Sequence, residues 1–277
     1  MTTPAGLYAV SDLHVSHPEN RDVLEALRPR NPADWLIVAG DVAETVADVD
    51  WALRLLAGRF ARVLWVPGNH ELWTPPTDPV TLRGAERYDH LVALCRELGV
   101  LTPEDPYPVW SAGDRPVVVA PLFQLYDYSF LPPGVPDTDS ALRQAYDVGV
   151  VCSDEFLLHP DPYPSRAAWC ADRVARTEAR LDALDPHLPT VLVSHWPLLR
   201  EPTDPLFYPE FSLWCGTTRT AHWPQTYRAV ACVYGHLHIP RSHEVGGLRM
   251  EEVSVGYPRE WKRWRHRRDP KEPRRVL

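Results

Sequence analysis

Short apolar runs, rather than long ones, dominate the hydrophobic pattern of this chain. Runs of three to five residues, rich in β-branched side chains, predict buried strands. They lie at 7–10, 36–39, 63–66, 191–193 and 230–234. Apolar positions with helical spacing lie at 19–27, 46–56, 84–98 and 165–184, and Ser165 is a suitable N-cap for the last of these segments. Strands that alternate with helices predict an α/β fold.

The segment 123–164 interrupts this alternation. It is dense in proline and aromatic residues, as in Tyr126-Asp127-Tyr128, and it is too apolar for a plain flexible linker. We expect a cap or wall beside the functional site, with a surface-packed insertion as the alternative. The remainder of 1–258 is expected to form a single domain, followed by a tail at 259–277.

The composition suits one large soluble domain. The chain has 277 residues, of which 44% are hydrophobic. No apolar run approaches the roughly 20 residues of a spanning helix, and the amino terminus lacks a signal pattern, so no membrane association is expected. The five cysteines are odd in number and form no Cys-x-x-Cys pair, which is typical of reduced thiols. We therefore expect a cytoplasmic protein.

Charge is unevenly distributed along the chain. The formal net charge is −8, yet residues 259–275 carry +6, so the rest carries −14. A basic tail could steer an acidic partner towards the protein. It could instead fold back on the acidic body, or bind nucleic acid with Trp261 and Trp264 stacked on bases. The acidic body would repel a polyanion, which disfavours nucleic acid.

A cluster of polar residues follows each predicted strand. The clusters are Asp12 with His14, Gly40-Asp41, Gly68-Asn69-His70-Glu71, Ser194-His195 and Gly235-His236-Leu237-His238. The carboxyl ends of strands meet at one edge of a sheet, so these side chains should converge. Imidazole, carboxylate and amide ligands suit divalent ions such as manganese, iron(II) or zinc. The pattern predicts a two-metal phosphoesterase centre.

The order Asp-x-His, Gly-Asp, Gly-Asn-His-Glu, His and Gly-His-x-His resembles the calcineurin-like metallophosphoesterase superfamily, from Asp12 to His238. The resemblance implies a four-layer sandwich of two mixed β-sheets flanked by helices. It also implies two divalent cations, manganese or iron, with zinc as an alternative. One would be held by Asp12, His14, Asp41 and His238, and the other by Asp41, Asn69, His195 and His236.

The same resemblance leaves His70 unligated and facing the phosphate, where it would stabilise charge or protonate the leaving oxygen. Two cations about 3.5 to 4 Å apart lower the pKa of a bound water, so water rather than a side chain is the expected nucleophile. The competing hypothesis is a binding scaffold without catalysis. No expected ligand is missing, and His70 is present, which favours an enzyme.

The loops bear on the substrate. The continuation Val42-Ala43-Glu44-Thr45 departs from the Asp-Arg-Gly of protein phosphatases and dinucleoside tetraphosphatases, which argues against both. The loops 68–73, 213–220 and 254–261 look like a bacterial branch of phosphopantetheinyl hydrolases, which remove the 4′-phosphopantetheine arm from acyl carrier proteins. We therefore expect a phosphodiesterase acting on holo acyl carrier protein. The alternatives are a phosphodiesterase for cyclic nucleotides or other small phosphodiesters, and a nuclease-type activity.

Three further residues are candidates for substrate binding. Arg219 is the best candidate for binding the phosphate outside the metals, because a guanidinium can make two parallel hydrogen bonds to phosphate oxygens. Trp73 and Tyr257 could line a channel for the pantetheine arm. The alternatives are an ordinary surface arginine and two core-packing aromatic residues.

Overall fold

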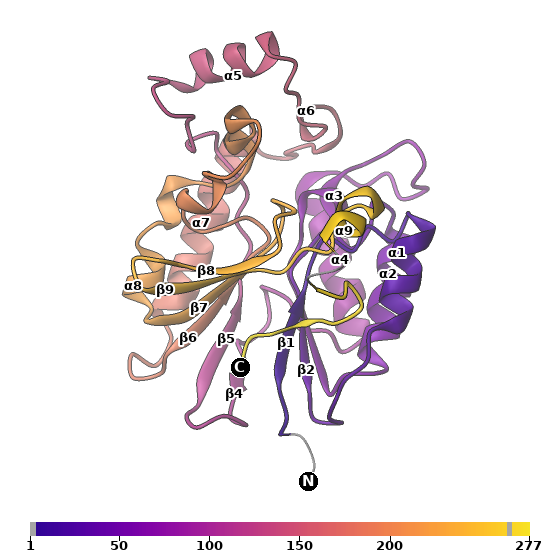
Figure 1. Cartoon of the computed structure of the whole chain (residues 1–277). Helices are drawn as coiled ribbons and strands as arrows, with labels where there is room; N and C mark the ends of the chain where they lie inside the picture. Colours follow the sequence, from indigo (N-terminus) through magenta and orange to yellow (C-terminus); the bar gives the residue numbers. More distant parts are fainter. Residues whose placement is uncertain (1–3, 265–267) are drawn as a thin grey trace.

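The computed structural model describes residues 4–264 and 268–277, and two β-sheets pack face to face within it (Figure 1). The first sheet has the order β10-β1-β2-β3. Its strands are β1 (Leu7–Val10), β2 (Trp35–Val38), β3 (Arg62–Trp65) and β10 (Arg274–Arg275). β1, β2 and β3 are parallel, whereas β10 runs antiparallel to β1, so the sheet is mixed.

The second sheet has the order β4-β5-β6-β7-β9-β8. Its strands are β4 (Val109–Trp110), β5 (Val117–Pro121), β6 (Thr190–Val193), β7 (Ala229–Tyr234), β8 (Arg241–Val245) and β9 (Leu248–Glu252). The four inner strands are parallel, and the edge strands β4 and β8 are antiparallel to their neighbours. This sheet is therefore also mixed.

Alternation along the strands builds two cores. In β1, Leu7 and Ala9 belong to the apolar layer between the sheets, whereas Tyr8 and Val10 pack in the larger core on the helical side. Because successive side chains point to opposite faces of a strand, a strand buried on both faces has a continuous apolar run. That is why the short runs in the sequence identify these strands.

Helices cover the outer face of each sheet (Figure 1). The first sheet is covered by α1 (Pro18–Ala26), α2 (Val46–Ala57) and α4 (Gly84–Glu97), and the second by α7 (Arg166–Asp182) and α8 (Trp223–Thr226). The four predicted helices are confirmed, and the Ser165 hydroxyl caps α7 by accepting a hydrogen bond from the Ala168 amide at 3.1 Å. The four-layer α/β sandwich is confirmed.

The segment 123–164 contains α5 (Thr138–Asp147) and α6 (Asp154–Leu157), which lie beyond the carboxyl ends of the strands (Figure 1). The other short helices are α3 (Asn69–Leu72), η1 (Glu201–Thr203), η2 (Pro209–Trp214) and η3 (Thr218–Thr220). Gln144 of α5 donates a hydrogen bond to Glu210 of η2 at 3.0 Å. The segment expected as a cap is thus packed against the loop that follows β6.

The described residues of the carboxyl-terminal segment are folded onto the domain. α9 (Pro258–Trp264) precedes β10, which pairs with β1 through Arg274 and Arg275. The five cysteines are buried and unpaired. Within the two described ranges, none of the helices combines the length and apolar character needed to cross a bilayer.

Candidate metal centre

The polar clusters that follow the strands converge where the two sheets meet. Their backbones are unusual, because Asp12, His14, Asp41, His236 and His238 all have positive φ, between 41° and 69°. Tyr128 and Arg228 are the two other non-glycine residues with positive φ in the described part of the chain. Left-handed backbone is unfavourable for such residues and is concentrated at functional sites. The strain therefore marks this junction as the site.

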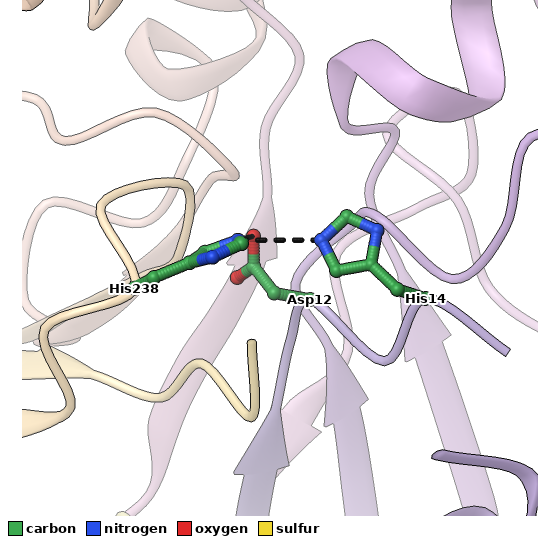
Figure 2. A group of neighbouring side chains, drawn as sticks. All are labelled: Asp12, His14 and His238. Atoms are coloured by element: carbon green, nitrogen blue, oxygen red, sulfur yellow. Dashed lines mark hydrogen bonds and ion pairs between the residues drawn. The ribbon is translucent and has the colours of Figure 1, made fainter. Parts of the chain in front are cut away.

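The first group of predicted ligands joins β1 to the loop after β7. The Nε2 atoms of His14 and His238 lie 3.2 Å apart, and His238 Nε2 lies 3.0 Å from Asp12 Oδ1 (Figure 2). Figure 2 shows the two rings pointing toward one another, with the carboxylate of Asp12 against His238. The Asp12 carboxylate is held in place by the hydroxyls of Ser11 and Ser254, at 2.6 and 2.8 Å.

The second group lies around Asn69. Its Oδ1 atom is 3.1 Å from His195 Nε2 and 3.1 Å from His236 Nδ1. Asp41 Oδ2 lies 3.4 Å from His195 Nε2. Potential ligand atoms of Asp41 fall within 4.8 Å of those of His195 and His236, and also of those of His14 and His70. Asp41 therefore lies between the two groups, as expected for a shared ligand.

Two glycines allow these loops to approach one another. A Cβ on Gly68 would lie 2.1 Å from Asp41 Oδ1, and a Cβ on Gly40, which has a φ of +83°, would lie 2.6 Å from the Gly68 nitrogen. Contacts this short do not occur in proteins, so both positions require glycine. The expectation that Gly40 lets the backbone approach closely is confirmed.

Two of the histidines are oriented by hydrogen bonds on the far side of their rings. His195 Nδ1 lies 2.9 Å from the carbonyl oxygen of Ala39, and His238 Nδ1 lies 2.7 Å from Glu260 Oε2. A proton on Nδ1 leaves the Nε2 lone pair directed at the other ligands. These contacts therefore select the tautomer that binds a metal.

His70 lies at the edge of the centre. Its Nδ1 atom is 2.9 Å from Glu44 Oε1, and its Nε2 atom is 3.8 Å from Asp41 Oδ2. The ring of Trp73 packs on the imidazole, with the centroids 3.6 Å apart. A hydrogen-bonded carboxylate on one ring nitrogen leaves the other free to face a substrate, the arrangement needed for a general acid.

Two buried carboxylates hold the ligand loops together. Glu71 accepts hydrogen bonds from the amides of Asp41 and Gly68, at 2.9 and 3.0 Å, and so connects two clusters. Asp154, at the start of α6, accepts from Asn69 Nδ2 at 3.0 Å and from Trp73 Nε1 at 2.6 Å. The contact with the Asn69 amide nitrogen directs its oxygen towards His195 and His236.

The electrostatics favour anionic carboxylates. Burial by itself raises the pKa of Asp41, but His195 and His70 hold it well below its usual value. Asp12 behaves similarly, since burial by itself raises its pKa, but His238 and His195 together hold it below its usual value. Burial and the nearby His195 lower the pKa of His236 to about 3, so this imidazole is neutral and its lone pair is available.

The donor set fits divalent cations. Ring nitrogens lie 3.2 Å apart between His14 and His238 and between His195 and His236, so each pair is close enough to share either a proton or a cation. A cation between them would bind both lone pairs, together with the carboxylates of Asp12 and Asp41. The donors are nitrogen and oxygen without thiolate, which suits manganese, iron and zinc.

A cavity of about 670 Å³ opens over these ligands. Asp41, Asn69, His70, His236 and His238 form its floor, and Tyr257 is also among its lining residues. The ring of Tyr257 stacks on His14, with the centroids 4.5 Å apart. The structure therefore places the predicted substrate residue Tyr257 at the cavity.

The other two predicted substrate residues lie elsewhere. Arg219 is not among the lining residues, and its Nε atom lies 3.3 Å from Asp127 Oδ2. Trp73 packs on His70 and is not among the lining residues of the cavity. The arginine that lines the cavity is Arg259, at the start of α9.

Sequence reasoning did not assign roles to Glu44, Glu71, Asp154 and Glu260. Glu44 follows Asp41 by three residues and Glu71 ends the Gly-Asn-His-Glu motif, so their proximity to the motifs was available as a signal. Asp154 is far from any motif in sequence, and Glu260 lies in the loop 254–261, 22 residues after His238. Only the folding of the cap and of α9 brings them to the centre.

Comparisons with known proteins agree with this geometry. The family described as calcineurin-like phosphoesterase matches residues 7–240, which include every predicted metal ligand. A protein of Mycobacterium tuberculosis (strain ATCC 25618 / H37Rv), named acyl-carrier-protein phosphodiesterase PptH, is 59% identical over 257 residues, or 93% of this chain and 79% of its own length. The crystal structure of phosphopantetheinyl hydrolase (PptH) from Mycobacterium tuberculosis has a TM-score of 0.96 at 56% identity, covering 100% of this chain and 97% of that one.

Proposed function

The chain belongs to the calcineurin-like phosphoesterase family, and on that premise we propose that it hydrolyses the phosphodiester that joins 4′-phosphopantetheine to holo acyl carrier protein. The observation that carries this proposal is the convergence of two groups of potential ligands, Asp12, His14 and His238 in one and Asp41, His195 and His236 in the other. Asp41, His236 and His238 of these groups also line the cavity. The similarity to a protein named for this activity supports the choice of substrate. The products would be apo carrier protein and 4′-phosphopantetheine.

The proposed ligand assignment follows the two groups of side chains. Asp12, His14, Asp41 and His238 would hold one divalent cation, and Asp41, Asn69, His195 and His236 the other. Such a pair of cations activates water and neutralises charge on a phosphoryl group. Manganese and iron are the ions we propose, with zinc as the alternative, because imidazole, carboxylate and amide oxygen donors suit all three. The buried free cysteines suit a reducing compartment, and we propose a cytoplasmic protein on that ground.

His70 is the proposed general acid. A serine alkoxide is a poor leaving group, so its departure requires a proton as the bond to phosphorus breaks. Glu44 accepts a hydrogen bond from His70 Nδ1 at 2.9 Å, which favours the protonated imidazole and directs Nε2 into the cavity. Burial by itself lowers the pKa of His70, but Asp41 and Glu44 raise it above its ordinary value.

The segment 123–164 is proposed to act as the cap of this centre. Val150 lines the cavity, and Asp154 orients the amide of Asn69. The cap therefore shapes the substrate channel and also supports a metal ligand. Tyr257 would line the channel beside His14. The role proposed from sequence for Arg219 stays a prediction, and its ion pair with Asp127 does not favour it.

Intact-mass spectrometry tests this function. A holo acyl carrier protein is incubated with the enzyme and manganese, with the Asp41→Asn variant alongside. A mass loss equal to the phosphopantetheinyl group, absent with the variant, is the expected result. An unchanged carrier mass, with bis-p-nitrophenyl phosphate still hydrolysed, would replace this substrate with a small phosphodiester.

A further inference from the structure

The mouth of the cavity has two chemically different walls. The first, which we call the apolar wall, consists of Leu206, Phe207 and Tyr208 together with Val150 of the cap. The second is formed by the start of α9, with Arg259 and its neighbours. Both walls rise from the same floor of predicted metal ligands. A substrate bound in the cavity therefore meets both an apolar surface and a charged surface.

The apolar wall ends in two exposed aromatic side chains. Phe207 is 87% exposed and Tyr208 is 54% exposed, and their rings pack edge to face with the centroids 4.8 Å apart. Large apolar side chains gathered at a cavity mouth are typical of a surface that a ligand covers. Phe207 and Tyr208 belong to the segment between η1 and η2, which lies next to the cap.

The outer face of α9, which we call the basic face, carries Arg259, Lys262 and Arg263. All three side chains are exposed, that of Arg259 by 79%. Lys262 forms an ion pair with Glu19, and Arg259 Nε lies 3.9 Å from Glu260 Oε1, whereas Arg263 contacts no acidic group within the described residues. The basic face thus keeps the positive charge of Arg263, which no acidic group of that part of the protein neutralises.

The position of α9 is fixed relative to the metal centre. Its inner side donates a hydrogen bond from Trp261 Nε1 to Asn20 of α1 at 2.8 Å, and its Glu260 carboxylate contacts His238 at 2.7 Å. The charged side chains on the outer side of α9 therefore have a defined position beside the cavity. This is the geometry of a docking surface rather than of a free tail.

Each wall of the cavity suits one of the two substituents of a phosphodiester. A phosphodiester has two substituents that leave the phosphorus in different directions. On the proposed function, one substituent is the serine of the carrier and the other is the pantetheine arm. The serine side chain is short, so the carrier must lie directly against the cavity mouth. The arm extends away from the carrier, and its gem-dimethyl group and methylene units are apolar.

We propose, resting on the function proposed above, that the basic face of α9 docks an acidic helical surface of the carrier protein while the apolar wall binds the pantetheine arm. Charge complementarity assigns the carrier, a small acidic domain, to the α9 side. Burial of apolar surface assigns the arm to Phe207 and Tyr208.

Two substrates that both contain the pantetheine arm distinguish docking of the carrier from binding of the arm. One is holo acyl carrier protein, and the other is a synthetic diester that joins 4′-phosphopantetheine to N-acetylserine methylamide. The variants are Arg263→Glu for the basic face and Phe207→Ser for the apolar wall. Arg115→Glu is the matched charge control, because Arg115 is exposed in the loop between β4 and β5, at the opposite end of the strands from the cavity. The readout is the ratio of kcat/KM for the carrier to kcat/KM for the synthetic diester.

The expected results differ between the two walls. Arg263→Glu lowers the ratio about tenfold at low salt, through slower association, and added salt narrows the difference from wild type. Arg115→Glu leaves the ratio within twofold of wild type. Phe207→Ser lowers kcat/KM about tenfold for both arm-bearing substrates, so its ratio stays near that of wild type.

Several outcomes would overturn the proposal. Equal ratios for Arg263→Glu and Arg115→Glu would mean that α9 does not dock the carrier. A lowered ratio for Phe207→Ser would place the carrier, not the arm, on the apolar wall. The proposal also fails if a single-stranded oligonucleotide inhibits the wild type but not Arg263→Glu, while both proteins turn over the carrier equally well. That result would assign the basic face to nucleic acid. If wild type cleaves neither arm-bearing substrate yet hydrolyses bis-p-nitrophenyl phosphate, the proposed function itself fails, whatever the variants do.

Discussion

Glu260 Oε2 lies 2.7 Å from Nδ1 of His238, so a residue of α9 orients a predicted metal ligand 22 residues earlier in the chain. Burial by itself raises the pKa of Glu260, but the hydrogen bond and charge of His238 lower it below its ordinary value. When a carboxylate accepts a hydrogen bond from one ring nitrogen of a histidine, it fixes the orientation of the ring and makes the other ring nitrogen a more basic metal ligand.

Glu260→Ala is therefore expected to weaken metal binding by about 10- to 100-fold. The measurement is metal titration by calorimetry, supported by metal content after gel filtration. Glu260→Gln keeps an acceptor oxygen and should lie between wild type and Glu260→Ala. The control is Glu272→Ala, which removes an exposed carboxylate of the same segment. Equal metal affinities in the two alanine variants would show that Glu260 does not support His238.

Metal binding is also expected to stabilise the folded protein, because the cations would bind a cluster that exists only in the folded state. At a metal concentration about 100-fold above Kd, the gain of about 2.7 kcal/mol should raise Tm by roughly 5 to 10 °C. The measurement is thermal unfolding of chelator-treated protein with and without manganese. Asp41→Asn removes the shared carboxylate, so its Tm should respond much less to the metal. A full response in Asp41→Asn would contradict the assignment of Asp41 as the shared ligand.

His70→Asn is expected to lower kcat by about 10²- to 10⁴-fold for a serine phosphodiester, because the alkoxide would leave without a proton. The loss should be smaller for bis-p-nitrophenyl phosphate, since p-nitrophenolate is a stable leaving group. Glu44→Gln should lower kcat less than His70→Asn does, and again more for the serine phosphodiester than for bis-p-nitrophenyl phosphate. The control is His90→Asn, an exposed histidine of α4. Equal losses for both substrates would argue that His70 stabilises phosphoryl charge instead of protonating the leaving oxygen.

Asp154→Ala is expected to lower metal affinity by roughly 10-fold, because the amide of Asn69 loses the acceptor that directs its oxygen towards the metal ligands. Asp154→Asn keeps an acceptor oxygen and should retain most of the affinity. Metal titration measures both variants. Asp147→Ala, on the exposed side of the cap helix α5, serves as the control. An alanine variant that binds metal as tightly as the asparagine variant would limit Asp154 to packing of the cap.

The predicted strands and helices agree with the structure because their signals are local. A run such as Leu7–Val10 is apolar at every position because both faces of β1 are buried, and the Ser165 cap depends on residues three apart. The predicted ligands follow from the same local rule, since strand ends of one sheet must lie near one another. The sequence alone therefore determined the α/β class, the expected centre and the family resemblance.

Other features depend on contacts between segments that are distant along the chain. Asp154 contacts Asn69 across 85 residues, and Trp261 contacts Asn20 across 241. Such pairings leave no periodicity or spacing in the sequence, because each depends on how whole elements pack. For the same reason, the sequence did not indicate that Arg219 would pair with Asp127 or that Arg259 would line the cavity. Local patterning set which side chains end each strand, and only tertiary packing decided which carboxylates orient them and which charges surround the cavity.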